Sequence, residues 1–420
     1  MKKYSLITMA LVAASVAVAE VSDEQFQKLV NEIALLKGEQ SDLSVLAEPA
    51  SKLKLGGYGE IHGNFKQGGD DKFDIHRLVM YMGYDFNDWI KLNSEVELEH
   101  AFVADSDTDT DTAGPGPAPK TSPNGGEISI EQLFVDFELS DAFNVRVGRM
   151  PAPLGIINEH HEPVLFLGVE RPNVDKYIIP STWSVDGAGI FGSPLSWLSY
   201  QAYVVAGLDG SKFSAKKGVR SGRIKERGGL NDPAFTGRLD FFPFVDADLP
   251  AGQDLRIGVS GYYGGTNNKN EGGDSDPSAD NTFAMYSADF EYDVSRFRFR
   301  GVVAHGKNSD ADKLGGGVGE EIFGWYLEGG VSVMPESWKK GKLAEADIIP
   351  FVRYEEYDTQ HKLPTGIAKT KSNDRTEVTV GVKFSLTPQL VLKADYQFMD
   401  DASSARRDNQ FNLGMGWMLQ

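Results

Sequence analysis

From Leu53 to the C-terminus, apolar and polar residues alternate with a period of two, and this pattern constrains the fold more than any other feature. The clearest example is the run 378–386, in which apolar residues occupy every even position. Positions i and i+2 of a β-strand lie on the same face, so such runs predict strands with one apolar and one polar face. Because the runs recur without interruption by a long helical pattern, we expect an all-β structure for residues 53–420.

The strand count and the connections between strands distinguish a membrane barrel from a soluble β-sandwich, which would also alternate. We expect sixteen strands, at 53–65, 73–86, 90–103, 127–139, 143–150, 184–193, 197–207, 234–242, 254–264, 281–292, 296–306, 319–334, 346–358, 375–386, 389–400 and 409–419. The number is even, and connections at one end are short while those at the other are long, apart from the tight 66–72. Both properties are typical of outer-membrane barrels. We therefore predict a transmembrane β-barrel of sixteen antiparallel strands.

The composition agrees with a barrel and excludes several other classes of protein. Hydrophobic residues make up 40% of the chain and charged residues 25%, which is polar for a membrane protein unless half of each strand faces water. Cysteine is absent, which excludes disulfides and thiolate metal sites. The net charge of −19 argues against nucleic acid as a partner, because phosphate binding needs a basic surface.

The N-terminus has the pattern of a signal peptide. Lys2 and Lys3 precede an apolar stretch at 6–18, and Ala17-Val18-Ala19 supplies the small residues that a signal peptidase requires. The apolar stretch is shorter than the roughly 20 residues of a membrane-spanning helix, so a membrane anchor is the less favoured alternative. We expect residues 1–19 to be removed after Ala19 and the mature protein to reach the bacterial outer membrane.

Residues 20–48 are predicted to form a periplasmic coiled-coil helix. A capping-box pattern begins at Ser22 and is followed by apolar residues at three- and four-residue spacing from Phe26 to Leu43, with Gln40 as one polar core position. Self-association through this helix is the favoured interpretation. A single amphipathic helix packed on the barrel and a frayed tail are the alternatives.

The connection 151–183 carries the most specific motifs in the chain. They are Gly148-Arg149, Asn158-Glu159-x-His161-Glu162-Pro163, Gly168-Val169-Glu170-Arg171, Ile179-Pro180-x-Thr182-Trp183 and Gly187-x-Gly189. With these motifs the mature chain resembles the phosphate-selective porin O and P family, and its N-terminal helix resembles that of dicarboxylate-type porins. The resemblance implies an outer-membrane porin, usually a homotrimer, whose third loop folds into the pore as a constriction.

This resemblance and the barrel together indicate passive diffusion of small hydrophilic solutes, with a bias toward anions such as phosphate or carboxylates. The expected partners are outer-membrane lipids, lipopolysaccharide, anionic or neutral solutes and two further copies of the chain. The basic loop 211–227 is a candidate for collecting anions or contacting lipopolysaccharide, and is equally consistent with a solvated loop. The alternative function is a surface-binding, adhesin-like or structural barrel without specific transport.

Alternation also predicts which charged residues face the lumen. We expect a basic set and an acidic set on opposite walls, which would create a transverse field across the pore. Wall salt bridges are the alternative for these strands, and solvated or salt-bridged charges are the alternative for the loop acids. The candidate pore-lining and constriction residues are Arg146, Arg296, Arg298, Arg300, Glu95, Glu97, Glu99, Glu159, Glu162 and Glu170.

No metal, cofactor or catalytic site is expected. His160 and His161 are adjacent, so on an extended chain their side chains point apart. The acidic run 105–111 (DSDTDTD) lacks the spacing and closing Glu of a calcium loop. The chain has no G-x-S-x-G nucleophile motif and its 7 histidines are scattered in sequence, so we do not expect an enzyme.

Overall fold

The computed structural model describes residues 52–100, 126–247, 253–269, 281–403 and 409–419. The predicted signal peptide, the predicted coiled-coil helix and the acidic run 105–111 lie outside these residues. The chain divides into two units, Met1–Leu53 and Lys54–Gln420, and the second contains the barrel. No helix among the described residues is long and apolar enough to cross a membrane.

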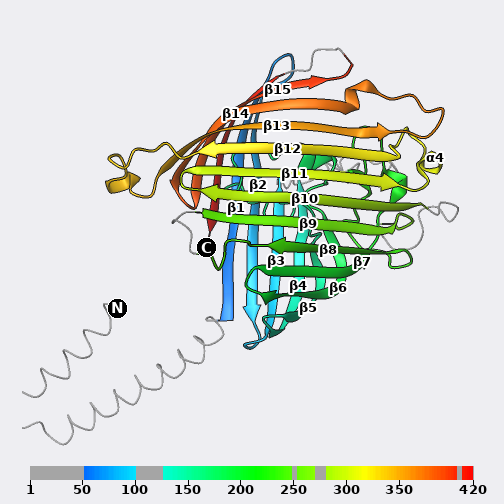
Figure 1. Cartoon of the computed structure of the whole chain (residues 1–420), viewed down its shortest axis with the longest axis horizontal. Coiled ribbons are helices and arrows are strands. Elements are labelled where there is room, and N and C mark those ends of the chain that lie inside the picture. The colour runs from blue at the N-terminus through cyan, green and yellow to red at the C-terminus, as the bar shows by residue number, and fades with distance from the viewer. Residues whose placement is uncertain (1–51, 101–125, 248–252, 270–280, 404–408, 420) are drawn as a thin grey trace, which may run out of the picture. The chain divides into compact units, whose positions relative to one another are not determined.

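Sixteen antiparallel strands form a closed barrel, which confirms the predicted fold class and strand count (Figure 1). Each strand pairs with its neighbours in sequence, and β1 closes the ring against β16, with Ile61 opposite Met415. The strands are β1 (Leu53–Lys66), β2 (Lys72–Asp85), β3 (Ile90–Glu99), β4 (Glu127–Ser140), β5 (Phe143–Pro151), β6 (Ser184–Leu195), β7 (Leu198–Ala206), β8 (Pro233–Phe241), β9 (Gln253–Gly265), β10 (Thr282–Val294), β11 (Phe297–Asn308), β12 (Glu321–Val331), β13 (Asp347–Lys362), β14 (Asp374–Thr387), β15 (Leu390–Asp401) and β16 (Gln410–Leu419).

Most strand ends lie within two residues of the predicted ends, and the larger differences have a physical cause. The predicted strand 346–358 ends early, because β13 continues to Lys362 through polar residues on both faces. Thr359 and Gln360 of this extension are both buried although both are polar, so alternation between apolar and polar residues gives no signal there. The predicted strands 90–103 and 319–334 are too long, since β3 ends at Glu99 and β12 occupies only Glu321–Val331.

The two faces of the strands have the environments that alternation predicts, with the polar face more buried than the apolar one. On β14, Thr379 and Lys383 point inward and are buried, whereas Val380 is 40% exposed on the outer surface. A lipid-facing surface made of apolar side chains is the property that allows a barrel to sit in a bilayer. The burial of the polar face requires material inside the barrel.

That material is the connection between β5 and β6, residues 152–183, here called loop L3. It contains the short helix α3 (Val174–Tyr177) and contributes the fully buried side chains of Leu154, Ile157 and Trp183. These pack on inward residues of the opposite wall; for example, the Trp183 and Tyr262 rings lie 4.8 Å apart. The main hydrophobic core of the barrel unit therefore lies between loop L3 and the inner wall, where apolar burial stabilises the loop.

The remaining helices are short and lie in connections. They are α4 (Ala311–Leu314), η1 (Gly210–Lys212), η2 (Arg220–Gly222), η3 (Gly341–Leu343) and η4 (Lys371–Asn373). Two of them, η1 and η2, belong to the connection between β7 and β8, residues 207–232, here called loop L4. Gly222 of loop L4 packs so closely on the Phe213 ring that a side chain at this position would collide with it.

Candidate functional site

Loop L3 is attached to the inner wall mainly through its own backbone. Inward cations donate to its carbonyl oxygens: Arg238 to Gly155 at 2.7 Å, Arg300 to Leu165 at 2.9 Å, Lys393 to Gly168 at 2.7 Å, and Lys383 to Val164. Inward carboxylates accept its N–H groups: Asp395 from Val169 at 2.6 Å and Glu355 from Val174 at 3.2 Å. Charge-assisted bonds of this kind are stronger than neutral ones, so the wall charges fix the path of the loop.

Several of these wall cations also have carboxylate partners. Arg353, which is fully buried, lies 3.0 Å from Glu355 and 3.3 Å from Glu328. Arg238 lies 2.8 Å from both Asp240 and Asp289. Charges buried in this way need a partner to offset the cost of leaving water. These residues hold the loop and are unavailable to a passing solute.

The three arginines predicted to line the pore at the start of β11, here called the arginine stack, lie in three different environments. Arg300 lies under loop L3 with its side chain 11% exposed, 3.2 Å from Glu328. Arg298 is 51% exposed and lies 3.7 Å from Asp293. Arg296 lies in the exposed turn between β10 and β11.

Arg146 and Glu159 come together at a smaller cavity of about 340 Å³. Arg146 makes two hydrogen bonds to Asp136, at 2.8 and 2.9 Å, and its guanidinium lies over the Phe134 ring. Glu159 accepts a hydrogen bond from Gln201 at 2.9 Å. This cavity lies beside the ends of β5, β6 and β7.

The buried cluster around His161 joins loop L3 to β3 and β4. The Nε2 of His161 lies 3.3 Å from Glu131 and 3.6 Å from Glu95. Burial alone would lower the pKa of His161, but the hydrogen bonds and charges of Glu131 and Glu95 raise this pKa to about 10. His161 is therefore a cation at neutral pH, held between two carboxylates.

The predicted acids Glu97 and Glu162 also have local partners. Glu97 lies 3.3 Å from Arg77, which lies 2.5 Å from Glu60 and donates to the carbonyl of His161 at 3.3 Å. Glu162 accepts a hydrogen bond from the Tyr81 hydroxyl at 3.1 Å.

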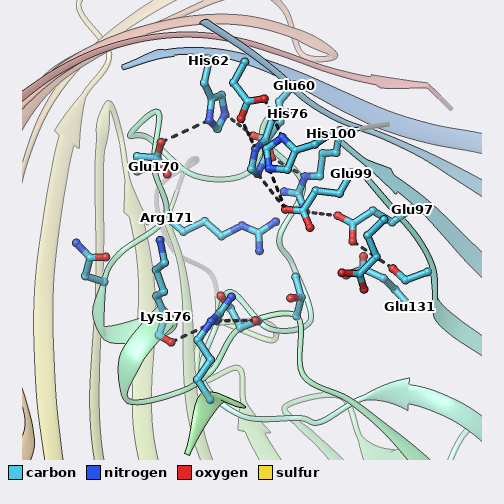
Figure 2. A pocket seen from close by; sticks show the side chains of 18 of the residues that line it. Glu60, His62, His76, Glu97, Glu99, His100, Glu131, Glu170, Arg171 and Lys176 are labelled. Carbon is cyan, nitrogen blue, oxygen red and sulfur yellow. Dashed lines mark hydrogen bonds and ion pairs between the residues drawn. The ribbon is translucent and has the colours of Figure 1, made fainter. Parts of the chain in front are cut away.

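A cavity of about 1400 Å³ lies between loops L3 and L4 and the wall formed by β1 to β4 (Figure 2). Acids and histidines project from the wall, and Figure 2 shows Arg171 and Lys176 facing them from loop L3. Three of the predicted pore-lining and constriction residues, Glu97, Glu99 and Glu170, line this space. Glu170 lies 3.4 Å from His62; burial alone would raise the pKa of Glu170, but His62 lowers it to about 2. The acids that line the wall side of the cavity are Glu60, Asp74, Glu97, Glu99 and Glu131.

Three arginines on the loop side of this cavity, Arg171, Arg220 and Arg223, have no carboxylate within ion-pair distance among the described residues. Arg171 donates to the carbonyl of His161 at 3.3 Å, and Arg223 donates to the carbonyls of Ser181 and Thr182 at 2.7 Å each and to the Thr182 hydroxyl at 3.2 Å. Burial, together with the other arginines nearby, lowers the pKa of Arg171 and Arg220 and lowers that of Arg223 to about 9. This group of uncompensated guanidiniums, here called the arginine cluster, carries positive charge that a bound anion would neutralise.

The sequence indicated some of these residues and missed others. Arg171 lies in the motif Gly168-Val169-Glu170-Arg171, and Arg220 and Arg223 lie in the basic loop 211–227. No feature of the sequence indicates that these arginines lie close together. His76 and Arg77 are consecutive in β2 and both line the cavity, so alternation breaks at this point and could not have placed His76 beside His62. Their proximity depends on strand register, which only the structure supplies.

Comparisons with known proteins give the fold. No model of a known protein family matches the chain. An uncharacterised protein of Aquifex aeolicus is 29% identical over 388 residues, which cover 87% of this chain and 80% of that protein. Among solved structures, OmpF of Salmonella typhi in complex with daunomycin matches with a TM-score of 0.53 at 12% identity, covering 87% of this chain and 97% of that one.

Two further solved structures match the chain with similar TM-scores. A loop-deletion mutant of OmpT, an outer membrane protein of Vibrio cholerae, matches with a TM-score of 0.52 at 12% identity over 87% of this chain and 98% of that one. The outer membrane channel DcaP of Acinetobacter baumannii matches with a TM-score of 0.51 at 12% identity over 87% and 96%. The closed barrel of sixteen strands is thus the fold of the outer-membrane porins.

Proposed function

We propose that this protein is an outer-membrane porin through which small hydrophilic solutes diffuse passively, with a bias toward anions that carry phosphate or carboxylate groups. The observation that carries the proposal is the arginine cluster, whose guanidiniums line a cavity and have no acidic partner in the part of the chain that the structure describes. Guanidinium groups bind carboxylate and phosphate with two parallel hydrogen bonds, so their chemistry suits such anions. The fold and the similar channels support the porin class.

The electrostatic arrangement explains why an acidic protein would favour anions. The net charge of −19 covers the whole chain, whereas a solute in the cavity meets the local field. Acids on the β1–β4 wall are paired with Arg77 and with histidines, and the arginine cluster opposite them is not paired. Low-dielectric walls strengthen this local field. We therefore assign selectivity to Arg171 and its neighbours rather than to the arginine stack of β11.

The other parts of the proposal follow from the porin class. The protein would reside in the bacterial outer membrane after cleavage behind Ala19, in contact with lipid and lipopolysaccharide. We propose a homotrimer, with residues 20–48 as a self-associating periplasmic helix and residues 53–420 as the barrel. Glu159, Glu162 and Glu170 would lie along the constriction that loop L3 creates.

Planar-bilayer recordings in a salt gradient test the proposal. The wild-type protein is expected to give discrete conductance steps and a reversal potential of the sign that indicates anion preference. Arg171→Gln should move the reversal potential toward cation preference, because it removes a charge that is not paired with a carboxylate among residues 52–100, 126–247, 253–269, 281–403 and 409–419. Arg171→Lys should retain the preference, since it keeps the charge. Arg227→Gln is the matched control, because Arg227 is exposed in the same basic loop region.

Two outcomes would contradict the proposal. A folded protein that never conducts would favour the surface-binding or structural role instead. Conductance with the same reversal potential in wild type, Arg171→Gln and Arg227→Gln would exclude the arginine cluster as the source of selectivity.

A further inference from the structure

Three of the 7 histidines meet on the cavity wall, although they are far apart in sequence (Figure 2). The His62 and His76 rings stack with centroids 4.8 Å apart, and the His76 and His100 rings meet edge to face at 5.0 Å. Register brings the second pair together, because the His100 N–H donates to the His76 carbonyl across β2 and β3 at 2.9 Å. His100 has the left-handed backbone angle φ of 46°, which is uncommon for a residue with a side chain.

Asp74 fixes the orientation of two of these rings. One of its carboxylate oxygens lies 3.0 Å from Nδ1 of His76, and the other lies 2.8 Å from Nδ1 of His100. When both Nδ1 atoms donate to Asp74, both Nε2 atoms carry a free lone pair. A carboxylate that binds the far nitrogen of an imidazole is the usual support of a metal-ligating histidine.

Both free nitrogens face the same oxygen. The Nε2 of His76 lies 3.7 Å from Oε1 of Glu99, and the Nε2 of His100 lies 3.9 Å from that atom. Bonds of roughly 2.0–2.1 Å to a tetrahedral ion would place its ligands about 3.3 Å apart. The two spacings to Glu99, 3.7 and 3.9 Å, are within about 0.6 Å of that value, and ligand atoms of Asp74, His76 and His100 lie within 4.8 Å of one another, so two imidazoles and two carboxylates converge here.

We propose that His76, His100 and Glu99 bind a divalent transition-metal ion such as Zn²⁺, through the two Nε2 atoms and one carboxylate oxygen, with Asp74 as the positioning residue. Two imidazole ligands favour a transition metal over Ca²⁺ or Mg²⁺, which prefer oxygen. His62 is not a ligand, because its two nitrogens face Glu60 at 3.0 Å and Glu170 at 3.4 Å. Its ring instead stacks on the ring of His76.

The site is open to ions in the cavity. The side chains of His76, His100 and Glu99 are 26%, 48% and 34% exposed, so an ion can enter and water can complete its coordination. A bound ion would add positive charge to the wall opposite the arginine cluster and would increase anion preference. That consequence depends on the proposed porin function, whereas metal binding itself does not.

Metal binding is tested by titrating Zn²⁺ into the folded full-length mature protein in detergent, without a polyhistidine tag, by isothermal calorimetry. One equivalent per chain is expected, and Co²⁺ should give the strong visible absorption of a tetrahedral site. His76→Ala and His100→Ala should each abolish that absorption, and Glu99→Gln should reduce it. Asp74→Asn should weaken affinity on the order of 10–100-fold while retaining the site.

His305→Ala is the matched control, since His305 also lies beside a carboxylate, Glu321 at 3.1 Å, but away from this wall. It should bind Zn²⁺ like wild type. Retention of barrel folding is checked for every variant by the shift in electrophoretic migration on heating. A wild-type protein that binds no Zn²⁺, or a His76→Ala/His100→Ala variant that binds it as wild type does, would overturn the proposal. A Glu99→Gln variant with unchanged Co²⁺ absorption would overturn the ligand set.

Discussion

Individual charged residues inside this barrel act mostly as attachments between loop L3 and the wall. His161 is the clearest example, because one imidazolium lies between Glu131 and Glu95 while its own carbonyl accepts from Arg77 and Arg171. Removing one member of such a group leaves the others buried without compensation, which costs more than the pair itself contributes.

His161→Gln is expected to lower the stability of the folded barrel by about 3–5 kcal/mol, the usual cost of breaking a buried ion pair. The pKa of His161 is about 10 in the folded protein against an ordinary 6.5, so its contribution is complete below pH 6.5 and is lost as the pH rises toward 10. Unfolding by guanidinium in detergent should therefore show a gap between wild type and variant that narrows from pH 6.5 to pH 10. The control is His160→Gln, whose side chain is exposed; an equal loss there, or a gap independent of pH, would contradict this role.

The contribution of Asp175 in helix α3 to folding stability should fall as the pH rises. Burial raises its pKa to about 8 from an ordinary 3.8, so the folded state holds a proton that the unfolded chain releases. Stability is then highest below pH 3.8 and falls as the pH rises to about 8. Asp175→Asn, which does not titrate, should melt at a higher temperature than wild type above pH 8. Asp312→Asn, at an exposed position, should leave the melting temperature unchanged; a lower melting temperature for Asp175→Asn would show that the carboxylate is ionised and needed.

At the residue level, the sequence predicted the direction in which side chains point better than the partners with which they interact. Alternation correctly placed Thr379 and Lys383 inward, because side-chain direction in a strand depends only on phase. It could not show that Lys383 donates to Val164 or that Arg300 lies under Leu165, since these contacts depend on the path of a loop 32 residues long by its bounds. For the same reason the arginine cluster, drawn from two loops, was not predicted as a group.

At the level of elements, the strands were predictable and loop L3 was not. Each strand has a periodic signal of its own, whereas loop L3 gains its form from side chains spread over the inner wall from β1 to β16. Val169, for example, packs where a side chain at Gly414 would collide with it, and its N–H donates to Asp395. The position of the loop is thus a property of the closed barrel.

Lys393→Met should loosen loop L3 locally. The substitution keeps the length of the side chain but leaves the carbonyl of Gly168 without its donor, which costs about 1–3 kcal/mol for a buried group. We expect larger current fluctuations in single-channel recordings and faster proteolysis within residues 152–183. Lys307→Met, on the exposed side of β11, should change neither. Quiet channels and wild-type proteolysis in Lys393→Met would show that the remaining attachments suffice.

At the level of the whole molecule, the pairing of β1 with β16 removes every sheet edge from the barrel. Open edges expose unpaired backbone groups that a hydrocarbon environment does not tolerate. The even strand count and the asymmetry of the connections predicted this closed barrel from the sequence, because both are typical of outer-membrane barrels.

Closure and register can be tested with engineered disulfides, since the chain contains no cysteine. Ile61 and Met415 are direct partners across β1 and β16, at a separation that suits a disulfide. Ile61→Cys with Met415→Cys should form a covalent ring on oxidation and migrate differently from the reduced protein after boiling. Ile61→Cys with Leu413→Cys places the thiols on a diagonal roughly 7–8 Å apart and should not close. Equal closure of both pairs would contradict the register.

The attachment of loop L3 through backbone groups has a consequence for how this protein evolves. Val164 is held by its carbonyl oxygen and Val169 by its N–H group, and every residue type except proline offers both groups. Mutations that alter loop side chains facing the cavity therefore leave these attachments intact. If loop L3 sets solute preference as proposed, that preference can change by single substitutions in the loop while the barrel that supports it stays folded.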